Sequence, residues 1–324
     1  MNKINDINVS MIKKLRCAIL LFCIITFATA EGQEYSVARM MWWNVENLFD
    51  PSNDSLTADD EFTTTGTKHW TYNRFYQKKD SIYKTILYMG INRLPVAIGL
   101  CEVENARCLR NLCYRLSCFN YRYVHYDSPD ERGVDVALLY DSTRISILNS
   151  QAIPLMLEND RTRDILYVSA LYEQQDTIHV MVCHLPSQLG GATNTDWKRQ
   201  HAKSLLQSQI DSILLFQPSA KIVVMGDMNT LPQDDLNGMS NLMLPIQNSG
   251  QGTHKYQGIW TCLDQFYVSH SLFSQSETTI YSPQWLLEED AKYLDFKPRR
   301  TYVGYRYNDG YSDHLPIVLT IQKE

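Results

Sequence analysis

The sequence predicts an α/β fold in which two β-sheets pack face to face and helices cover their outer faces. Strand-like apolar runs occur in every third of the 324-residue chain, and they alternate with two long amphipathic segments. Neither an internal repeat nor a low-complexity linker interrupts the composition, and 44% hydrophobic residues can fill one large core. We therefore expect residues 31–324 to form one domain.

The first third of this domain is predicted to hold two strands and two helices. Strands are expected over residues 37–44 and 95–101, and helices over residues 70–89 and 105–116, with Asn105 as the N-cap of the second helix. The apolar residues near one face of the first helix are Phe75, Ile82, Ile86 and Met89.

The remaining chain is predicted to hold a further long helix over residues 195–216 and a series of strands. The apolar set of the helix is Trp197, Leu205, Leu206, Ile213 and Leu214. The strand-like runs are residues 121–126, 134–140, 144–153, 165–172, 177–184, 221–226, 263–269 and 315–321.

Residues 1–30 are typical of a secretory signal peptide. A basic stretch precedes 12 apolar residues, 17–28, which are too few to span a bilayer and which end at a small-x-small cleavage motif at residues 28–30. An uncleaved membrane anchor is the alternative; lipidation at Cys23 is disfavoured by the bulky Phe22. We expect export to the periplasm or the extracellular space, and no stable membrane insertion of the mature chain.

Charge argues against non-specific binding of polyanions. The first 30 residues carry four basic side chains and one acidic side chain, so their removal changes the formal charge from −6 to −9. An acidic surface repels phosphates unless a bound cation reverses the sign locally.

The cysteines predict neither a zinc site nor a disulfide framework. Six remain after cleavage, which permits disulfides, but no CxxC pair or Cys/His cluster has zinc spacing. Cys101, Cys183 and Cys262 fall in core-like stretches, where we expect buried free thiols.

Polar residues recur where buried strands end. Asn44, Glu102, His184, Asp227 and Asn229 each follow an apolar run. Any one of them could simply be a solvated or capping residue. Because strand ends of α/β folds meet at a common edge, five with the same placement favour a shared site.

Two short motifs are more specific. In Gly226-Asp227-Met228-Asn229, a carboxylate and an amide two residues apart can point the same way in an extended chain, although an Asx turn would also explain them. Ser312-Asp313-His314 places an acid and an imidazole before the last strand, where a plain loop is the alternative.

Six segments then occur in a set order over most of the chain. They are Trp43-Asn44-Val45-Glu46-Asn47, Leu100-Cys101-Glu102-Val103-Glu104, Cys183-His184-Leu185-Pro186-Ser187, Gly226-Asp227-Met228-Asn229, Leu263-Asp264-Gln265 and Ser312-Asp313-His314. In this order they resemble the motifs of the endonuclease/exonuclease/phosphatase superfamily. The runs 132–137 and 252–260 are similar to those of bacterial members of unassigned substrate. The resemblance implies a four-layered sandwich, two mixed sheets with helices outside, and a metal-dependent phosphoesterase site at one edge.

The resemblance also implies a metal site. Glu102 is expected as the principal metal ligand, Asp313 as its support, and Asn44 as a residue that positions the metal or the phosphate. Carboxylate oxygens are the ligands that Mg²⁺ prefers, so the expected cofactor is Mg²⁺, with Mn²⁺ as the alternative.

The remaining matched positions imply hydrolysis by direct attack of water on phosphorus. Asp227 would align or deprotonate the water, and Asn229 would orient it. His184 and His314 would bind the phosphate oxygens, while Asp264 would hold His314 in its useful tautomer. No Ser or Cys nucleophile motif is present in the sequence, which favours water over a covalent intermediate.

Arg132 and two departures from the family pattern leave questions open. Arg132 could contact the substrate phosphate or pair on the surface with Asp130 or Glu131. Gln188 stands where relatives often carry Arg, and Cys183 where Asn is frequent. The lone histidines are given no role, namely His125, His179, His201 and His254.

The substrate is predicted only as a class. Nucleic acid, nucleotides, inositol phosphates and phospholipid head groups are all served by the superfamily, and we expect a monomeric enzyme. Two rivals remain: a catalytically silent module that binds phosphate ligands on the same scaffold, and a sphingomyelinase-like enzyme at membrane surfaces. The second rival needs an exposed apolar loop, for which Trp285-Leu286-Leu287 is the candidate, although a core-packing role is the alternative.

Overall fold

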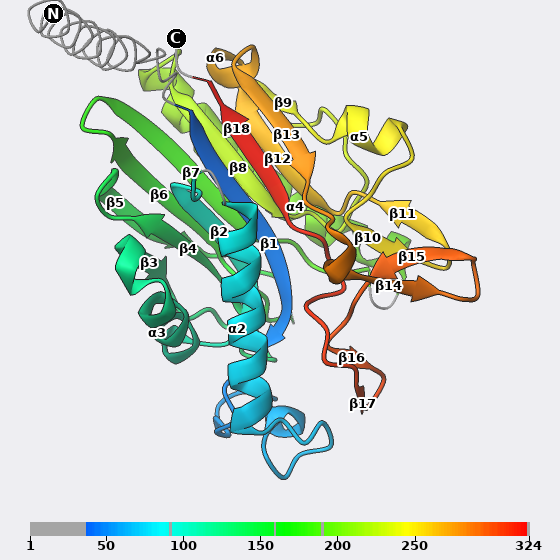
Figure 1. Ribbon diagram of the computed structural model, residues 1–324. Helices are drawn as coiled ribbons and strands as arrows, with labels where there is room; N and C mark the ends of the chain where they lie inside the picture. The colour runs from blue at the N-terminus through cyan, green and yellow to red at the C-terminus, as the bar shows by residue number, and fades with distance from the viewer. Residues whose placement is uncertain (1–36, 91–92, 159, 189–190, 323–324) are drawn as a thin grey trace, which may run out of the picture. The chain divides into compact units, whose positions relative to one another are not determined.

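Two six-stranded sheets face each other in the computed structural model, which describes residues 37–90, 93–158, 160–188 and 191–322 (Figure 1). The first sheet has the order β13 (Ser276–Ile280), β18 (Ile317–Ile321), β1 (Ala38–Leu48), β2 (Ala97–Val103), β4 (Asp135–Asp141) and β3 (Tyr121–His125). The second has the order β5 (Ile145–Ile153), β6 (Ile165–Tyr172), β7 (Asp176–His184), β8 (Lys221–Asp227), β12 (Asp264–Ser269) and β9 (Met239–Asn241). The predicted signal peptide over residues 1–30 lies outside the described residues.

Both sheets are mixed and share one design. The central pairs β1/β2 and β7/β8 are parallel, and their other neighbours run antiparallel. Parallel strands need a long crossover, which α2 (Tyr72–Met89) supplies in the first sheet and α4 (Ala192–Phe216) in the second. Together with α3 (Ala106–Arg115), these helices form the outer layers of the sandwich.

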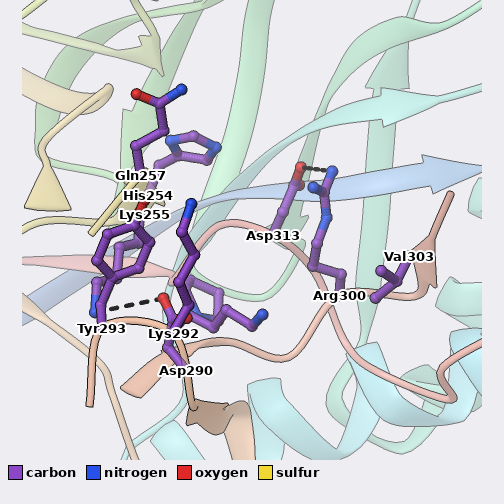
Figure 2. Close-up of a pocket in the computed structure, with 11 residues that line it drawn as sticks. His254, Lys255, Gln257, Asp290, Lys292, Tyr293, Arg300, Val303 and Asp313 are labelled. Atoms are coloured by element: carbon purple, nitrogen blue, oxygen red, sulfur yellow. Dashed lines mark hydrogen bonds and ion pairs between the residues drawn. The ribbon is translucent and has the colours of Figure 1, made fainter. Parts of the chain in front are cut away.

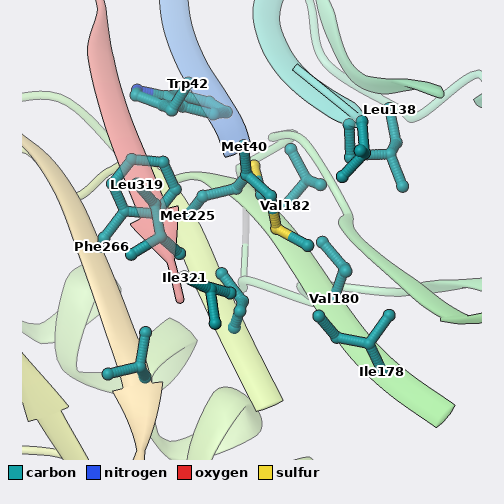
Figure 3. Packing of buried hydrophobic residues seen from close by; sticks show 14 of the residues in the cluster. Met40, Trp42, Leu138, Ile178, Val180, Val182, Met225, Phe266, Leu319 and Ile321 are labelled. Carbon is teal, nitrogen blue, oxygen red and sulfur yellow. The ribbon is translucent and has the colours of Figure 1, made fainter. Parts of the chain in front are cut away.

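Period-two alternation explains the four layers. On β1, Met40 and Trp42 face the core between the sheets, whereas Met41 and Trp43 belong to the layer beneath α2 and α3. Figure 3 shows Met40 and Trp42 together with Met225 of β8 in the inter-sheet core. The predicted four-layered sandwich is therefore confirmed.

The helix predictions are confirmed with one correction. Asn105 caps α3, since its side chain accepts hydrogen bonds from the backbone N–H groups of Arg107 and Cys108 at 2.9 and 3.1 Å. Trp197, assigned to the apolar face of α4, is instead 50% exposed. The buried face of α4 is formed by Ala202, Leu206, Ile210 and Ile213. Trp197 precedes Ala202 by five positions, which places it toward the opposite side of the helix.

Several short elements are not predicted by the sequence. Three hairpins lie in the C-terminal third: β10 (His254–Tyr256) with β11 (Ile259–Thr261), β14 (Leu287–Asp290) with β15 (Asp295–Pro298), and β16 (Tyr302–Val303) with β17 (Arg306–Tyr307). The other short elements are α5 (Leu244–Asn248), α6 (His270–Phe273), η1 (Asp60–Phe62), η2 (Ser117–Phe119) and η3 (Gln284–Leu286). Strands of two to four residues carry too little periodicity to be recognised.

The expected buried thiols are confirmed. Cys101, Cys183 and Cys262 are buried, and no disulfide joins any cysteines within the described residues. None of the described helices combines the length and the apolar character that crossing a membrane requires.

Candidate active site

Strand register brings the predicted site residues to one edge of the sandwich. His184 at the end of β7 pairs with Asp227 at the end of β8, and Asp227 pairs in turn with Asp264 at the start of β12. Because β12 runs antiparallel to β8, its first residue lies beside the last residue of β8. Three side chains distant in sequence thus lie on neighbouring strands, as the sequence predicted.

A backbone distortion aims Glu102 toward this edge. Glu102 adopts a left-handed conformation, with φ of 59°, where the register between β2 and β4 shifts. Such bulges redirect a side chain and are frequent near active sites. The Glu102 carboxylate accepts a hydrogen bond from the backbone N–H of Asn47 at 2.9 Å, and its side chain remains 14% exposed.

Asn44 links the carboxylates of the two sheets. Its Nδ2 lies 3.2 Å from Asp227 Oδ2 and 3.4 Å from Glu102 Oε1, while its Oδ1 accepts the backbone N–H of Glu46 at 3.0 Å. That last bond fixes the amide so that its donor faces both acids. Asn44 therefore positions the two carboxylates, although they belong to opposite sheets.

Asp227 is a buried carboxyl with a raised pKa. Its side chain is 2% exposed, and burial raises its pKa to about 7. Oδ1 accepts the backbone N–H of Asn229 at 3.0 Å, and Oδ2 accepts the Asn44 amide. Asn229 itself has φ of 50° and donates from Nδ2 to the carbonyl oxygen of Leu185 at 3.0 Å. A carboxyl with a pKa near neutrality can exchange protons at physiological pH.

His184 and His314 differ in charge although both are buried. Burial, reinforced by the positive charges of Arg163 and Arg132, holds the pKa of His184 well below its usual range. Burial also lowers the pKa of His314, but the carboxylates of Asp264 and Asp227 outweigh this effect and hold it well above its usual range. At neutral pH, His184 is therefore neutral and His314 is a cation.

The His314 cation is fixed by a fully buried carboxylate. Asp264 Oδ2 lies 2.7 Å from His314 Nδ1, and Oδ1 accepts the indole N–H of Trp42 at 2.7 Å. His314 Nε2 thereby points toward Asp227, with Nε2 and Asp227 Oδ2 3.8 Å apart. His184 Nε2 reaches the same oxygen at 3.6 Å and Glu102 Oε1 at 3.9 Å. The two imidazoles thus converge on Asp227.

Asp313 lies in a charged pair beside this centre. Arg300 Nη2 donates to Asp313 Oδ2 at 2.7 Å, and Arg300 Nε lies 3.6 Å from Glu46 Oε1. Burial raises the pKa of Asp313, but His314 and Arg300 outweigh that effect and lower it, which keeps the carboxyl ionised. Arg300 and Glu46 are site residues that the sequence did not single out individually.

His254, one of the lone histidines that were given no role from the sequence, lies beside His314. It forms a β-bridge with His314, and the two ring centres lie 4.9 Å apart. Burial, together with the charge of His314, lowers the pKa of His254 to about 4, so the ring is neutral. The only available signal was its place in the stretch 252–260 that resembles bacterial family members.

Arg132 forms the surface pair that was one of its two interpretations, and its contact with a substrate phosphate stays a prediction. Its Nε lies 3.8 Å from Asp130 Oδ1, so the surface pair exists, yet its charge also reaches His184. Asp130 additionally binds Arg163, whose Nη1 donates to Oδ2 at 2.9 Å in a buried pair. Arg163 was not recognised in the sequence, because a lone Arg before a strand carries no pattern.

The two departures from the family pattern have structural explanations. Gln188 donates from Nε2 to the backbone oxygen of Asn229 at 2.8 Å and so supports that loop. Cys183 faces the layer beneath α4, with its Sγ 3.7 Å from the sulfur of Met228. The Cys183 side chain therefore packs in that layer and does not hold His184.

The carboxylates at this edge, and not the protonated imidazole of His314, suit a hard cation. Asp227, Asp264 and His314 have ligand atoms within 4.8 Å of one another, as do His254, Asp313 and His314. In the first group, however, each Asp264 oxygen already accepts a 2.7 Å hydrogen bond. Glu102, partly exposed and held by one backbone N–H and a longer contact of 3.4 Å to the Asn44 amide, is the better-placed oxygen donor for a hard divalent cation.

Comparison with known proteins places this site in a family. The model of the Endonuclease/Exonuclease/phosphatase family matches residues 39–323. No curated protein is detectably similar in sequence. Among solved structures, human Nocturnin with a bound sulfate anion is similar at 16% identity and a TM-score of 0.56, with 89% of this chain and 95% of that chain covered.

Two further solved structures show the same fold. The D. rerio TDP2 complexed with a single-strand DNA product is 15% identical, with a TM-score of 0.56, and covers 89% of this chain and 100% of that one. The Bacteroides thetaiotaomicron mannosyl-6-phosphatase Bt3783 is 12% identical, with a TM-score of 0.56, and covers 87% and 98%. From the match over residues 39–323 and this shared fold, the chain belongs to the endonuclease/exonuclease/phosphatase family.

Proposed function

We propose that this protein is a divalent-metal-dependent phosphoester hydrolase in which an activated water attacks phosphorus. The observation that carries the proposal is the convergence of Glu102, Asp227 and His314 at one sheet edge, with a neutral and a cationic imidazole facing the same carboxylate. A phosphoester hydrolysis site needs a metal ligand, a base for water and positive groups for the phosphate oxygens, and these residues match that list.

Glu102 would hold the metal. Asn44 keeps the Glu102 carboxylate turned toward the site, and Asp313 would add support through the oxygen that does not bind Arg300. A bound Mg²⁺, or Mn²⁺ in its place, would polarise the phosphoryl oxygen and offset the negative charge of the surrounding acids.

Asp227 would take the proton from the attacking water. Its carboxylate is oriented by the Asn44 amide and the Asn229 N–H, so the oxygen that receives the proton is fixed before the reaction. His314 would bind a phosphate oxygen through the cationic Nε2–H, and its Nδ1–H remains bonded to Asp264. These contacts would strengthen as charge builds on the phosphate.

His184 and Arg132 would complete the phosphate contacts. Both acceptors nearest His184 Nε2 are carboxylate oxygens, so the proton of the neutral ring belongs on that nitrogen, from which it can donate to a phosphate. Arg132 is about half exposed, which leaves its guanidinium accessible to a substrate at the edge.

The membrane-surface alternative loses its candidate loop. Leu286 is 2% exposed, and Trp285 packs against Tyr281 and Tyr311. The segment Trp285-Leu286-Leu287 therefore belongs to the packing beneath it, which supports the core-packing alternative.

The test is hydrolysis of bis(p-nitrophenyl) phosphate, a phosphodiester with a coloured leaving group. We expect turnover with Mg²⁺, loss in EDTA and recovery on addition of Mg²⁺ or Mn²⁺. His314→Ala should lose turnover, and Glu102→Gln should need more metal for half-maximal rate. Turnover that is indifferent to EDTA would refute the metal, and tight phosphate binding without turnover would favour the silent binding module.

A further inference from the structure

A cavity opens directly beside the sheet edge that holds the candidate active site. Its volume is about 330 Å³, and it shares His254, Arg300 and Asp313 with the site described above. The β10–β11 and β14–β15 hairpins supply most of its wall, and Val303 of β16 adds to it (Figure 2). Small-molecule pockets span about 300–1,000 Å³, and this cavity lies near the lower end of that range. It therefore fits one or two nucleotide-sized or sugar-phosphate units, and not a nucleic-acid duplex.

The lining of this cavity is basic although the chain is acidic. Four cationic side chains, Lys255, Lys292, Lys297 and Arg300, face two carboxylates, Asp290 and Asp313. The whole sequence carries a formal charge of −6. Two further carboxylates, Asp295 and Glu288, lie within 4.0 Å of Lys255 and Lys297, so attraction of an anion depends on the lysines that lack close partners.

Two of the four cations are already neutralised by close partners. The Lys255 side chain is 1% exposed, and its Nζ lies 2.6 Å from Asp295 Oδ2 and 3.7 Å from Asp290 Oδ2. Arg300 is paired with Asp313, as Figure 2 shows. Lys255 therefore builds the wall of the cavity, and Arg300 belongs also to the neighbouring site.

Lys292 and Lys297 are the cations left to bind a ligand. Lys292 is exposed, and no carboxylate of the described residues lies within 4.0 Å of its ammonium, which sits 4.9 Å from the centre of the Tyr293 ring. Lys297 is 34% exposed and has only a long contact to Glu288, with 3.7 Å between Nζ and Oε1. Exposed ammonium groups with weak partners exchange them for a phosphate at little cost.

The wall beside Lys292 is formed by Tyr293. Tyr293 packs on the turn of the β10–β11 hairpin, where a Cβ added to Gly258 would come within 2.6 Å of the ring. Gly258 also has φ of 84°, a conformation that glycine tolerates best. The ring is therefore a fixed flat surface beside Lys292, suited to a sugar or a base.

We propose that this cavity binds a second phosphate of the substrate, carried on the same sugar as the reacting phosphoester or on the next one. Lys292 and Lys297 bind that phosphate, and Tyr293 contacts the sugar or base between the two phosphates. The inference rests on the proposed function, because the adjoining edge must hold the reacting phosphoester. The substrate class is then a phosphoester with a second anionic group, either a small bisphosphate or a short single strand.

The test uses substrates that differ only in the second phosphate. Thymidine 5′-(p-nitrophenyl phosphate) has no second phosphate, and thymidine 3′-phosphate 5′-(p-nitrophenyl phosphate) carries one on the same sugar. In a thymidine dinucleotide 5′-p-nitrophenyl ester, the second phosphate links the first sugar to the next one. We expect the wild type to prefer at least one of the latter two. Lys292→Gln and Lys297→Gln should each reduce the preference in kcat/KM about threefold, and the double variant about tenfold. Lys84→Gln, at an exposed position on α2, should keep the preference.

Equal kcat/KM for all three substrates, or a preference that survives the double variant, would overturn the proposal. If the wild type hydrolyses none of them, turnover of bis(p-nitrophenyl) phosphate decides separately whether the proposed function stands, and a binding measurement decides the subsite alone. Titration calorimetry of thymidine 3′,5′-bisphosphate in EDTA should then show weaker binding to the double variant than to Lys84→Gln. Equal affinities for the two variants would reject the subsite.

Discussion

Asp264→Asn tests whether His314 acts as a fixed cation. The substitution keeps the shape of a side chain that is fully buried, and it removes the charge that holds the imidazole. In the wild type, both carboxylate oxygens accept hydrogen bonds, one from Trp42 Nε1 and one from His314 Nδ1, each at 2.7 Å. An amide can accept at only one of these positions.

The indole of Trp42 determines the orientation of the new side-chain amide in Asp264→Asn. Trp42 Nε1 can only donate, so the amide oxygen must face it and the amide NH₂ must face His314 Nδ1. His314 Nδ1 must then accept, which moves the ring proton to Nε2 and leaves the ring neutral. Losing one charge-assisted bond removes roughly 1.5–3 kcal/mol of support for the cation. We expect the pKa of His314 to fall and kcat to drop by about 10²–10⁴, the range for displaced or mis-tautomerised imidazoles.

Two measurements check this prediction. ¹⁵N–¹H correlation spectra of labelled protein should show His314 protonated at both nitrogens in the wild type and at Nε2 alone in Asp264→Asn, and hydrolysis of bis(p-nitrophenyl) phosphate should fall in parallel. Asp176→Asn is the control, since its carboxylate forms a partly exposed pair with Lys221 at 2.9 Å and should leave both readouts unchanged. A fully active Asp264→Asn variant with a doubly protonated His314 would refute the reasoning.

Two further predictions concern the fold around the site. In Gly226→Ala, the new Cβ would lie 2.4 Å from both the carbonyl oxygen and the Sγ of Cys183, so strands β7 and β8 must separate. We expect urea titration to show a loss of about 1–3 kcal/mol in the free energy of unfolding. An unchanged urea midpoint would contradict this expectation. The pKa of His179 is lowered by burial next to the Tyr167 hydroxyl, with 2.8 Å between Oη and Nδ1, so the unfolded chain binds the proton more readily. The neutral ring therefore stabilises the fold above pH 6.5, and this contribution is lost as the pH falls below 6.5. Between pH 7 and pH 5, the melting temperature should fall more steeply for the wild type than for His179→Gln. Parallel curves of melting temperature against pH would count against this explanation.

Local patterns were sufficient for the main strands and for their ends. The continuous apolar run on β1, with Met40 and Trp42 on one face and Met41 and Trp43 on the other, predicts a strand buried on both sides. The Asn105 cap depends on two backbone N–H groups within three residues, so it is also recognisable from the sequence. The four-layered arrangement itself came from the family motifs.

The partners of the site residues could not be predicted in the same way. His254 meets His314 through a bridge between segments 60 positions apart, and Arg300 meets Asp313 and Glu46 only after the β16–β17 segment folds beside β1. The three short hairpins that bring these groups in have strands of two to four residues, too short for a period to appear.

The sequence by itself determined most of the longer strands, the long helices and the residue types that carry the chemistry, because each depends on neighbours within a few positions. The family motifs implied the contact between Asp264 and His314, but tertiary structure alone decided that the other oxygen of the Asp264 carboxylate accepts the indole N–H of Trp42, 222 positions away. It also decided that His184 is neutral while His314 is charged, since burial and the surrounding charges set the pKa of an imidazole. Those surroundings exist only once the strand register of both sheets is fixed.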